Sequence, residues 1–159
     1  MRAALPGPPE LDAMVDYAPE HAQALTQMWR ASFEHGVGIV DPHPVKEQRH
    51  FLETQLVRTT RVRVVLRGGT QVVAFMASTP DSVAQLYVRV QTIGQGLGAR
   101  LLEVAKAEST GSLWLYTFAQ NAPARRFYER HGFCEIERES PSENMFRLEA
   151  VKYRWLRST

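Results

Sequence analysis

The chain has 159 residues, of which 44% are apolar, 9% aromatic and 23% charged, a composition typical of a globular domain. Nineteen Lys and Arg against seventeen Asp and Glu give a formal charge of +2, so bulk charge does not indicate a nucleic-acid or membrane partner. The single cysteine, Cys134, excludes a disulfide framework and a multi-cysteine zinc site, and we expect it to be buried. Because no apolar run approaches the roughly 18 residues of a membrane-spanning helix, we expect a cytoplasmic protein.

The first ten residues contain three prolines and no apolar core of a secretory signal. Residues 1–10 are therefore expected to be a disordered lead-in. No repeat, low-complexity tract or linker follows, so residues 11–159 are expected to form one domain.

The first helix is expected to begin at Pro19, because apolar residues then recur at three- and four-residue steps. Residues 33–44 contain two glycines and two prolines, which predict the end of this helix and a long loop. A second helix follows from Val45, with Leu52 and Leu56 as its apolar positions.

From residue 61 the pattern changes to that of strands. Residues 61–66 and 72–77 flank Gly68-Gly69 and predict a hairpin. The rest of the chain is expected to alternate between strands at 83–90, 113–118, 133–138 and 145–155 and helices at 97–110 and 122–131. This order predicts an α/β fold with a mixed sheet and helices on both faces. Strands 83–90 and 113–118, joined by a right-handed helical crossover, are expected to be parallel neighbours.

Three glycines at alternate positions, Gly94, Gly96 and Gly98, separate a strand from a helix. Such a turn exposes backbone N–H groups at the positive end of the helix dipole and can bind a phosphate. A nucleotide P-loop would need Lys and then Ser or Thr after the last glycine, but Ala99-Arg100 follow. A dinucleotide-binding fold would need its third glycine one residue later and an acid about 20 residues on, and residues 118–121 lack one. A tight turn that only lets the helix pack closely is the structural alternative, and three glycines in register favour an anion site over it.

Two motifs then resemble those of the GNAT superfamily of acyl-CoA-dependent N-acyltransferases. The first is similar to its pyrophosphate-binding motif and comprises Leu86-Tyr87-Val88, Gly94-Gln95-Gly96-Leu97-Gly98 and Leu101-Leu102. The second is similar to the motif that follows and comprises Asn121, Ala124, Phe127-Tyr128-Glu129 and Gly132-Phe133. One departure is Ile93, where the family usually has Arg or Gln; since the contact there is mainly through a backbone N–H, the site is expected to remain.

The resemblance implies a GNAT-like, mostly antiparallel sheet (α+β in some schemes) whose central parallel strands splay apart. It also implies an N-acetyltransferase in which a substrate amine attacks acetyl-CoA directly in a ternary complex. Val88 would donate its backbone N–H to the developing oxyanion, and Tyr128 would be the general acid that protonates the thiolate. The positions that correspond to cofactor contacts are Tyr87, Val88, Val90, Ile93, Gly94, Gln95, Gly96, Leu97, Gly98, Ala99, Asn121, Ala124 and Tyr128.

Several of these residues have structural explanations as well. Tyr128 has the spacing of a core tyrosine, and Asn121 is placed to cap the helix that begins at Ala122. The pair Arg125-Arg126 either contacts a phosphate of CoA or provides charge on the solvated surface of the helix. A non-catalytic acyl-CoA-binding regulatory module is the alternative function, and the presence of both Tyr128 and Asn121 favours the enzyme.

The acceptor pocket is expected to include Phe33, Glu34, Tyr116 and Phe118, and no metal is expected. The identity of the acceptor is left open. The general base is also left open among the acids and histidines in or beside the predicted loop, which are Glu34, His35, Asp41, His43 and Glu47. The last strand offers an edge for a homodimer, and the oligomeric state is left open as well.

Overall fold

The computed structural model describes residues 12–158, so the lead-in expected at residues 1–10 lies outside the described residues. The strands are β1 Ala13–Asp16, β2 Arg61–Arg67, β3 Gln71–Ser78, β4 Val83–Val88, β5 Ser112–Phe118, β6 Cys134–Glu139 and β7 Ala150–Leu156. The helices are α1 Ala22–Val37, α2 Val45–Phe51, α3 Val57–Thr59, α4 Leu97–Glu108 and α5 Ala122–Arg130. Leu52–Leu56 form a π-helical turn that joins α2 to α3.

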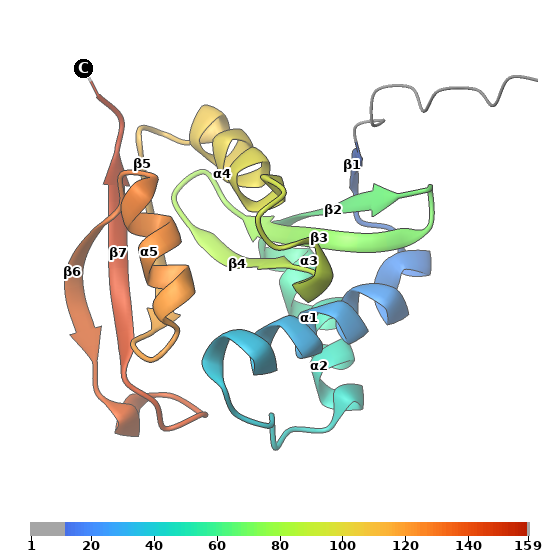
Figure 1. The fold of residues 1–159 in the computed structure, drawn as a ribbon, viewed down its shortest axis with the longest axis horizontal. Coiled ribbons are helices and arrows are strands. Elements are labelled where there is room, and N and C mark those ends of the chain that lie inside the picture. Colours follow the sequence, from blue (N-terminus) through green and yellow to red (C-terminus); the bar gives the residue numbers. More distant parts are fainter. Residues whose placement is uncertain (1–11, 159) are drawn as a thin grey trace, which may run out of the picture.

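The strands form two antiparallel sheets that stand beside each other (Figure 1). The order is β1-β2-β3-β4 in one sheet and β5-β7-β6 in the other. Between β4 and β5, an isolated parallel bridge joins Ser82 to Trp114, and the Trp114 N–H donates to the Asp81 carbonyl at 3.0 Å. The bridge lies at the beginning of both strands, so the two predicted parallel neighbours separate toward their carboxyl ends. The mixed α/β fold with a splayed parallel pair is thereby confirmed.

Helices cover both faces of the four-stranded sheet, as predicted, because alternate residues of its strands point to opposite sides. On one side, Val64 of β2 packs with Leu25 of α1 and with Leu52. On the other side, Val65 belongs to a core with Leu101 of α4 that continues onto the inner face of the second sheet. The helix α4 therefore lies where the two sheets meet (Figure 1).

The predicted end of the first helix was wrong. Helix α1 continues through Gly36 to Val37 and ends at Gly38, whose φ of 80° is the left-handed conformation that glycine tolerates. Phe33 and Glu34 are therefore helical residues and not loop residues. Gly36 allows α1 to approach Asn121 closely, because a Cβ at this position would lie 2.8 Å from Nδ2 of Asn121. A glycine in a helical sequence pattern can therefore indicate either close packing against a neighbouring element or the end of the helix.

Three smaller differences concern the edges of the fold. The strand β1, which pairs with β2, was missed because its four residues show no alternation between buried and exposed positions. The last strand begins at Ala150 and not at Met145. Cys134 was expected to be buried but lies exposed on the edge strand β6. None of the described helices is long and apolar enough to cross a membrane.

Candidate active site

A cavity of about 400 Å³ opens where β4 and β5 separate. One wall is formed by β4 and another by the end of β5 and the start of α5, including Asn121, Ala124 and Tyr128. The remaining walls come from α1, α2, the loop between these helices and the segment before β7. Many of the residues predicted for the site, although far apart in sequence, therefore border a single cavity.

Beyond the bridge at Ser82, the outer edge of β4 pairs with no other strand of the described residues. The Arg89 N–H donates to the Val73 carbonyl at 2.7 Å, and Val88 lies opposite Ala74 in the register. In an antiparallel ladder the hydrogen-bonding direction alternates from residue to residue, so the N–H of Val88 points away from β3. On that side the Val88 carbonyl accepts a hydrogen bond from Oγ of Ser32, at 2.8 Å. Sequence analysis missed Ser32, because a single helical serine carries no motif.

The glycine turn leaves open space and, among the described residues, unpaired N–H groups at the start of α4. Gly94 and Gly96 have φ values of 88° and 82°, and a Cβ at either would meet no atom within 4 Å. Gly96 is the N-cap of α4 and provides no capping side chain. The N–H groups of Gly96, Leu97 and Gly98 donate to no acceptor among the described residues, as expected at a helix N-terminus.

Gly98 differs from the other two glycines. A Cβ at this position would lie 3.2 Å from Cζ of Phe127 and 3.5 Å from Cγ2 of Val88. This glycine lets α4 pack against α5 and against the free edge of β4. The packing interpretation considered from sequence therefore applies to Gly98, whereas Gly94 and Gly96 leave open space, and the anion site stays a prediction.

The other positions predicted for the cofactor surround this turn. Val90 lies in the 3-10 turn that follows β4, and Ile93 is 57% exposed. The side-chain oxygen of Gln95 accepts a hydrogen bond from Arg67 at 2.8 Å, while Leu97 and Ala99 lie in the first turn of α4.

Tyr128 projects from α5 into the core and is 7% exposed. Its ring packs against Phe133 and Tyr153, at centroid distances of 5.6 and 6.3 Å. Its hydroxyl makes no hydrogen bond to a described residue, although the residue lines the cavity. Burial, with a smaller contribution from Tyr87, raises the pKa of Tyr128 well above its ordinary value. The phenol is therefore protonated at neutral pH.

Tyr87, on β4, is the second phenol at the cavity. Burial raises the pKa of Tyr87 to about 12; the hydrogen bond with the Trp29 side chain acts in the opposite direction, and the negative charge of Asp41 adds to the rise. Both phenols at the cavity are therefore protonated at neutral pH.

Asn121 both caps α5 and lines the cavity. Its Oδ1 accepts the Ala124 N–H at 3.3 Å, the geometry of an N-cap. The neighbouring Gln120 donates from Nε2 to the Val37 carbonyl at 2.6 Å. The carboxyl end of α1 is thereby fixed against the start of α5.

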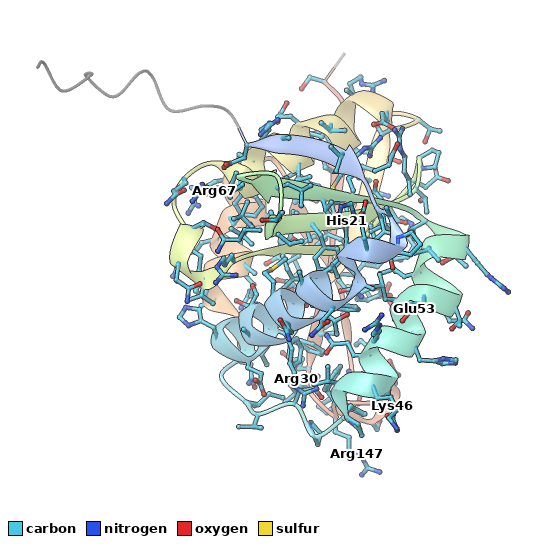
Figure 2. All side chains as sticks on the ribbon, turned by 90° about the vertical axis from the view of Figure 1, so that its right-hand side faces the viewer. His21, Arg30, Lys46, Glu53, Arg67 and Arg147 are labelled. Carbon is cyan, nitrogen blue, oxygen red and sulfur yellow. The ribbon has the colours of Figure 1, made fainter. Side chains whose placement is uncertain are left out.

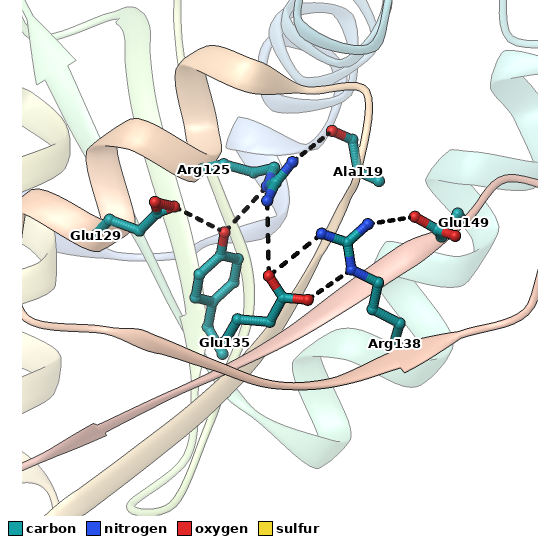
Figure 3. Close-up of polar contacts among 7 residues, drawn as sticks. Ala119, Arg125, Glu129, Glu135, Arg138 and Glu149 are labelled. Carbon is teal, nitrogen blue, oxygen red and sulfur yellow. Dashed lines mark hydrogen bonds and ion pairs between the residues drawn. The ribbon is translucent and has the colours of Figure 1, made fainter.

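A polar network holds α5 on the second sheet (Figure 3). The Tyr153 hydroxyl donates to Glu129 and accepts a hydrogen bond from Arg125, both at 3.1 Å. Arg125 also donates to the Ala119 carbonyl at 3.3 Å and pairs with Glu135 at 3.6 Å. The guanidinium of Arg125 is therefore occupied by these contacts. It is neither a solvated charge on the helix nor available to a CoA phosphate. Arg126 is exposed.

The residues predicted for the acceptor differ in how they meet the cavity. The rings of Phe33 and Phe118 lie 6.0 Å apart at the cavity. Tyr116 also borders the cavity, but it is 44% exposed, and its ring lies 5.8 Å from Trp114 with Nζ of Lys152 5.7 Å above it. Because Leu115 points into the core, the Tyr116 ring lies on the outer face.

The loop between α1 and α2 carries the candidate bases, and two of them form a pair. Nδ1 of His43 lies 2.8 Å from Oδ1 of Asp41, and both residues line the cavity. Glu34 does not line it; its carboxylate accepts the Asp41 N–H at 2.7 Å. Arg30, on the side of α1 next to this loop (Figure 2), donates to the carbonyls of His43 and Asp41 at 2.6 and 2.7 Å. His35 is exposed.

The glycine turn, the free edge of β4 and the start of α5 also lie in the part of the chain that matches a known family. Residues 58–135 match the family model of the acetyltransferase (GNAT) domain. The chain belongs to the GNAT family. It is accordingly an acyltransferase of a family that takes its acyl group from acyl-CoA. No curated protein sequence matches the chain.

Solved structures show the same fold over nearly the whole chain. Apo-form YjaB from Escherichia coli is similar with a TM-score of 0.77 and 17% identity, over 94% of this chain and 100% of that one. The PaiA N-acetyltransferase from Thermoplasma acidophilum, solved in complex with coenzyme A, gives a TM-score of 0.70 and 16% identity, over 91% and 98%. A ribosomal-protein-alanine N-acetyltransferase from Brucella melitensis gives a TM-score of 0.68 and 20% identity, over 91% of this chain and 99% of that one.

Proposed function

We propose that this GNAT domain transfers an acetyl group from acetyl-CoA to a primary amine of a small molecule, peptide or protein, by direct attack in a ternary complex. The observation that carries the proposal is the opening between β4 and β5. There the N–H of Val88, at the end of β4, points away from β3, and the buried phenol of Tyr128 lines the cavity that β4 borders. Acyl transfer needs a donor to the oxyanion and a source of a proton for the leaving group, and both are available here.

The start of α4 fits the pyrophosphate of CoA. The free N–H groups of Gly96, Leu97 and Gly98 would donate to its oxygens, with Gly94 leaving room for close approach. The helix dipole adds a favourable interaction with the negative charge. Arg126 is exposed on the neighbouring helix and would be available to a further phosphate.

The edge of β4 would bind the pantetheine arm as a strand binds its neighbour, and this arrangement brings the thioester to Val88. Acetyl-CoA supplies the activated acyl group when it is bound. The backbone N–H of Val88 would donate to the carbonyl oxygen as negative charge develops on it. The hydrogen bond from Ser32 to the Val88 carbonyl, at 2.8 Å, supports this role by fixing the orientation of the neighbouring peptide groups.

Tyr128 would give its proton to the sulfur as the C–S bond breaks. A raised pKa makes the phenol a weaker acid, and the same burial makes the departing thiolate a stronger base, so burial acts on both partners of the transfer. Asn121 would fix the start of α5 and, through it, the position of the phenol.

Two measurements test the proposal. Acetyl-CoA and CoA should raise the melting temperature in a concentration-dependent way, whereas NADH and ATP should not match them. In a panel of amines, mass spectrometry should detect a product heavier by one acetyl group together with free CoA thiol. Equal stabilisation by all four ligands would contradict the acyl-CoA site. Stabilisation by CoA without any acetylated product would favour the non-catalytic binding module.

A further inference from the structure

Part of the lining of the cavity is aromatic. Phe33 of α1, Phe118 of β5 and Phe146 before β7 form a triangle of rings with centroid distances of 4.9, 5.5 and 6.0 Å. Trp29 and Phe51 also line the cavity, with their own centroids 6.5 Å apart. Such walls suit the flat face of an apolar ligand.

The acidic and basic side chains that line the cavity are unbalanced in charge. Asp41 and Glu47 line the cavity, whereas no lysine or arginine of the described chain does. Arg30, the cation closest to the loop, donates to main-chain carbonyls and leaves the Asp41 carboxylate to His43. Gln48 also lines the cavity, and its buried Oε1 accepts no hydrogen bond from a described residue. A cationic donor would be stabilised here, and a carboxylate or phosphate would be repelled.

His43 is held so that one ring nitrogen remains available. Asp41 is nearly buried, and its Oδ1 lies 2.8 Å from Nδ1 of His43 while also accepting the His43 backbone N–H at 2.9 Å. With Asp41 ionised, this contact favours the proton on Nδ1 and leaves the lone pair on Nε2. The ring lies 5.1 Å from Phe146, edge to face, and is 29% exposed. The ring of His43, with the lone pair on Nε2, therefore lies beside the aromatic residues of the cavity.

We propose that the acceptor is an arylalkylamine, a primary amine on a flat apolar body without a carboxylate, and that His43 is its general base. This inference rests on the proposed acetyl transfer. The aromatic residues of the cavity bind the apolar body, the negative groups attract the ammonium, and Asp41 is a positioning residue for His43. A cavity of about 400 Å³ is of the size that encloses a small molecule.

In the proposed acetyl transfer, each proton and each bond is accounted for. Nε2 of His43 takes one proton from the ammonium and later gives it to solvent. The neutral amine forms a C–N bond to the thioester carbonyl, and the C–S bond then breaks. The second proton leaves the nitrogen of the adduct and replaces the one that Tyr128 gives to sulfur. The products are the N-acetylamine, CoA thiol and one proton in solution.

Binding can be tested separately from chemistry with the protein saturated with CoA. Calorimetry would compare 2-phenylethylamine with phenylalanine, which adds only a carboxylate, and with spermidine, which lacks the aromatic body. We expect 2-phenylethylamine to bind at least about 10²-fold more tightly than phenylalanine, because the carboxylate would face Asp41 and Glu47 without a counter-ion. Spermidine should bind more weakly than 2-phenylethylamine, since it leaves the aromatic wall uncovered.

The base is tested by turnover of 2-phenylethylamine with acetyl-CoA. His43→Asn places an amide nitrogen near the position of Nδ1, keeps the contact with Asp41 and removes Nε2. We expect kcat to fall about 10²-fold or more with little change in KM. In His43→Ala, added imidazole should restore part of the rate. His50→Asn, an exposed position on α2, is the matched control and should keep the wild-type rate.

Each outcome separates this inference from the function on which it rests. Equal affinity for phenylalanine, or preferred acetylation of spermidine, would overturn the acceptor class and leave acetyl transfer intact. Wild-type kcat in His43→Asn would overturn the role of His43. CoA binding without acetylation of any amine would contradict the proposed function itself, and the acceptor class with it.

Discussion

At the level of single residues, two tyrosines with raised pKa values, Tyr87 and Tyr128, line the cavity. Tyr128 is almost fully buried, and its hydroxyl is free of described partners. This combination reconciles the two interpretations of its sequence position, because the ring packs as a core tyrosine does while the hydroxyl borders the cavity. The position of Tyr128 in its motif predicted the residue, but only the folded chain reveals the raised pKa.

Tyr87 gives a pH-dependent test of this environment. Its pKa is raised to about 12, above the ordinary value of about 10, so the folded protein holds a proton that the unfolded chain releases. The free energy of unfolding should therefore fall as the pH rises from about 10 toward 12, by at most about 1.4 kcal/mol per pH unit for this group. Denaturant titrations at several alkaline pH values should show a shallower fall in Tyr87→Phe. An identical fall in both proteins would contradict the burial of the Tyr87 hydroxyl.

At the level of elements, the glycine turn and the helix behind it were predictable from sequence, and the acceptor side was not. The spacing of Gly94, Gly96 and Gly98 predicted an anion site, and the start of α4 has the required free N–H groups. By contrast, the pairing of Asp41 with His43 depends on a loop whose conformation Arg30 fixes through long-range contacts. Local sequence carries no signal for such contacts.

Gly96→Val tests the anion site predicted at the glycine turn. The valine would adopt an unfavourable φ of 82° and would place its side chain where a phosphate must approach. We expect CoA affinity to fall about tenfold or more while the protein stays folded. Gly69→Val is the matched control, because Gly69 has a φ of 80° in the β2–β3 turn and equally open surroundings. Calorimetry that found the same CoA affinity in both folded variants would make the turn purely structural.

At the level of the whole molecule, function requires that two sheets stay apart and that α5 stay fixed between them. The isolated bridge from Ser82 to Trp114 joins the strands at one end, and contacts from α1 to the start of α5 hold them at the other. Sequence order predicted the crossover but not the extent of the opening, because contacts between segments far apart in the chain, such as that of Gly36 with Asn121, are not visible in the local sequence.

The network of Tyr153 should contribute to this arrangement (Figure 3). Tyr153→Phe removes the hydrogen bonds to Arg125 and Glu129 without changing the buried ring. We expect a loss of about 1–3 kcal/mol in the free energy of unfolding, measured by urea denaturation. Tyr116→Phe, on the outer face of the sheet, should lose much less. Equal losses in the two variants would show that the network does not stabilise α5.

The central claim is that the opened strand edge and Tyr128 together carry out acetyl transfer. The most direct measurement is the rate of CoA thiol release from acetyl-CoA with a turned-over amine, in the wild type and in Tyr128→Phe. The account predicts a fall in kcat of about 10²-fold or more, with unchanged CoA affinity and with Tyr17→Phe, a tyrosine that does not line the cavity, at the wild-type rate. A Tyr128→Phe enzyme that keeps the wild-type kcat when chemistry is rate-limiting would contradict it.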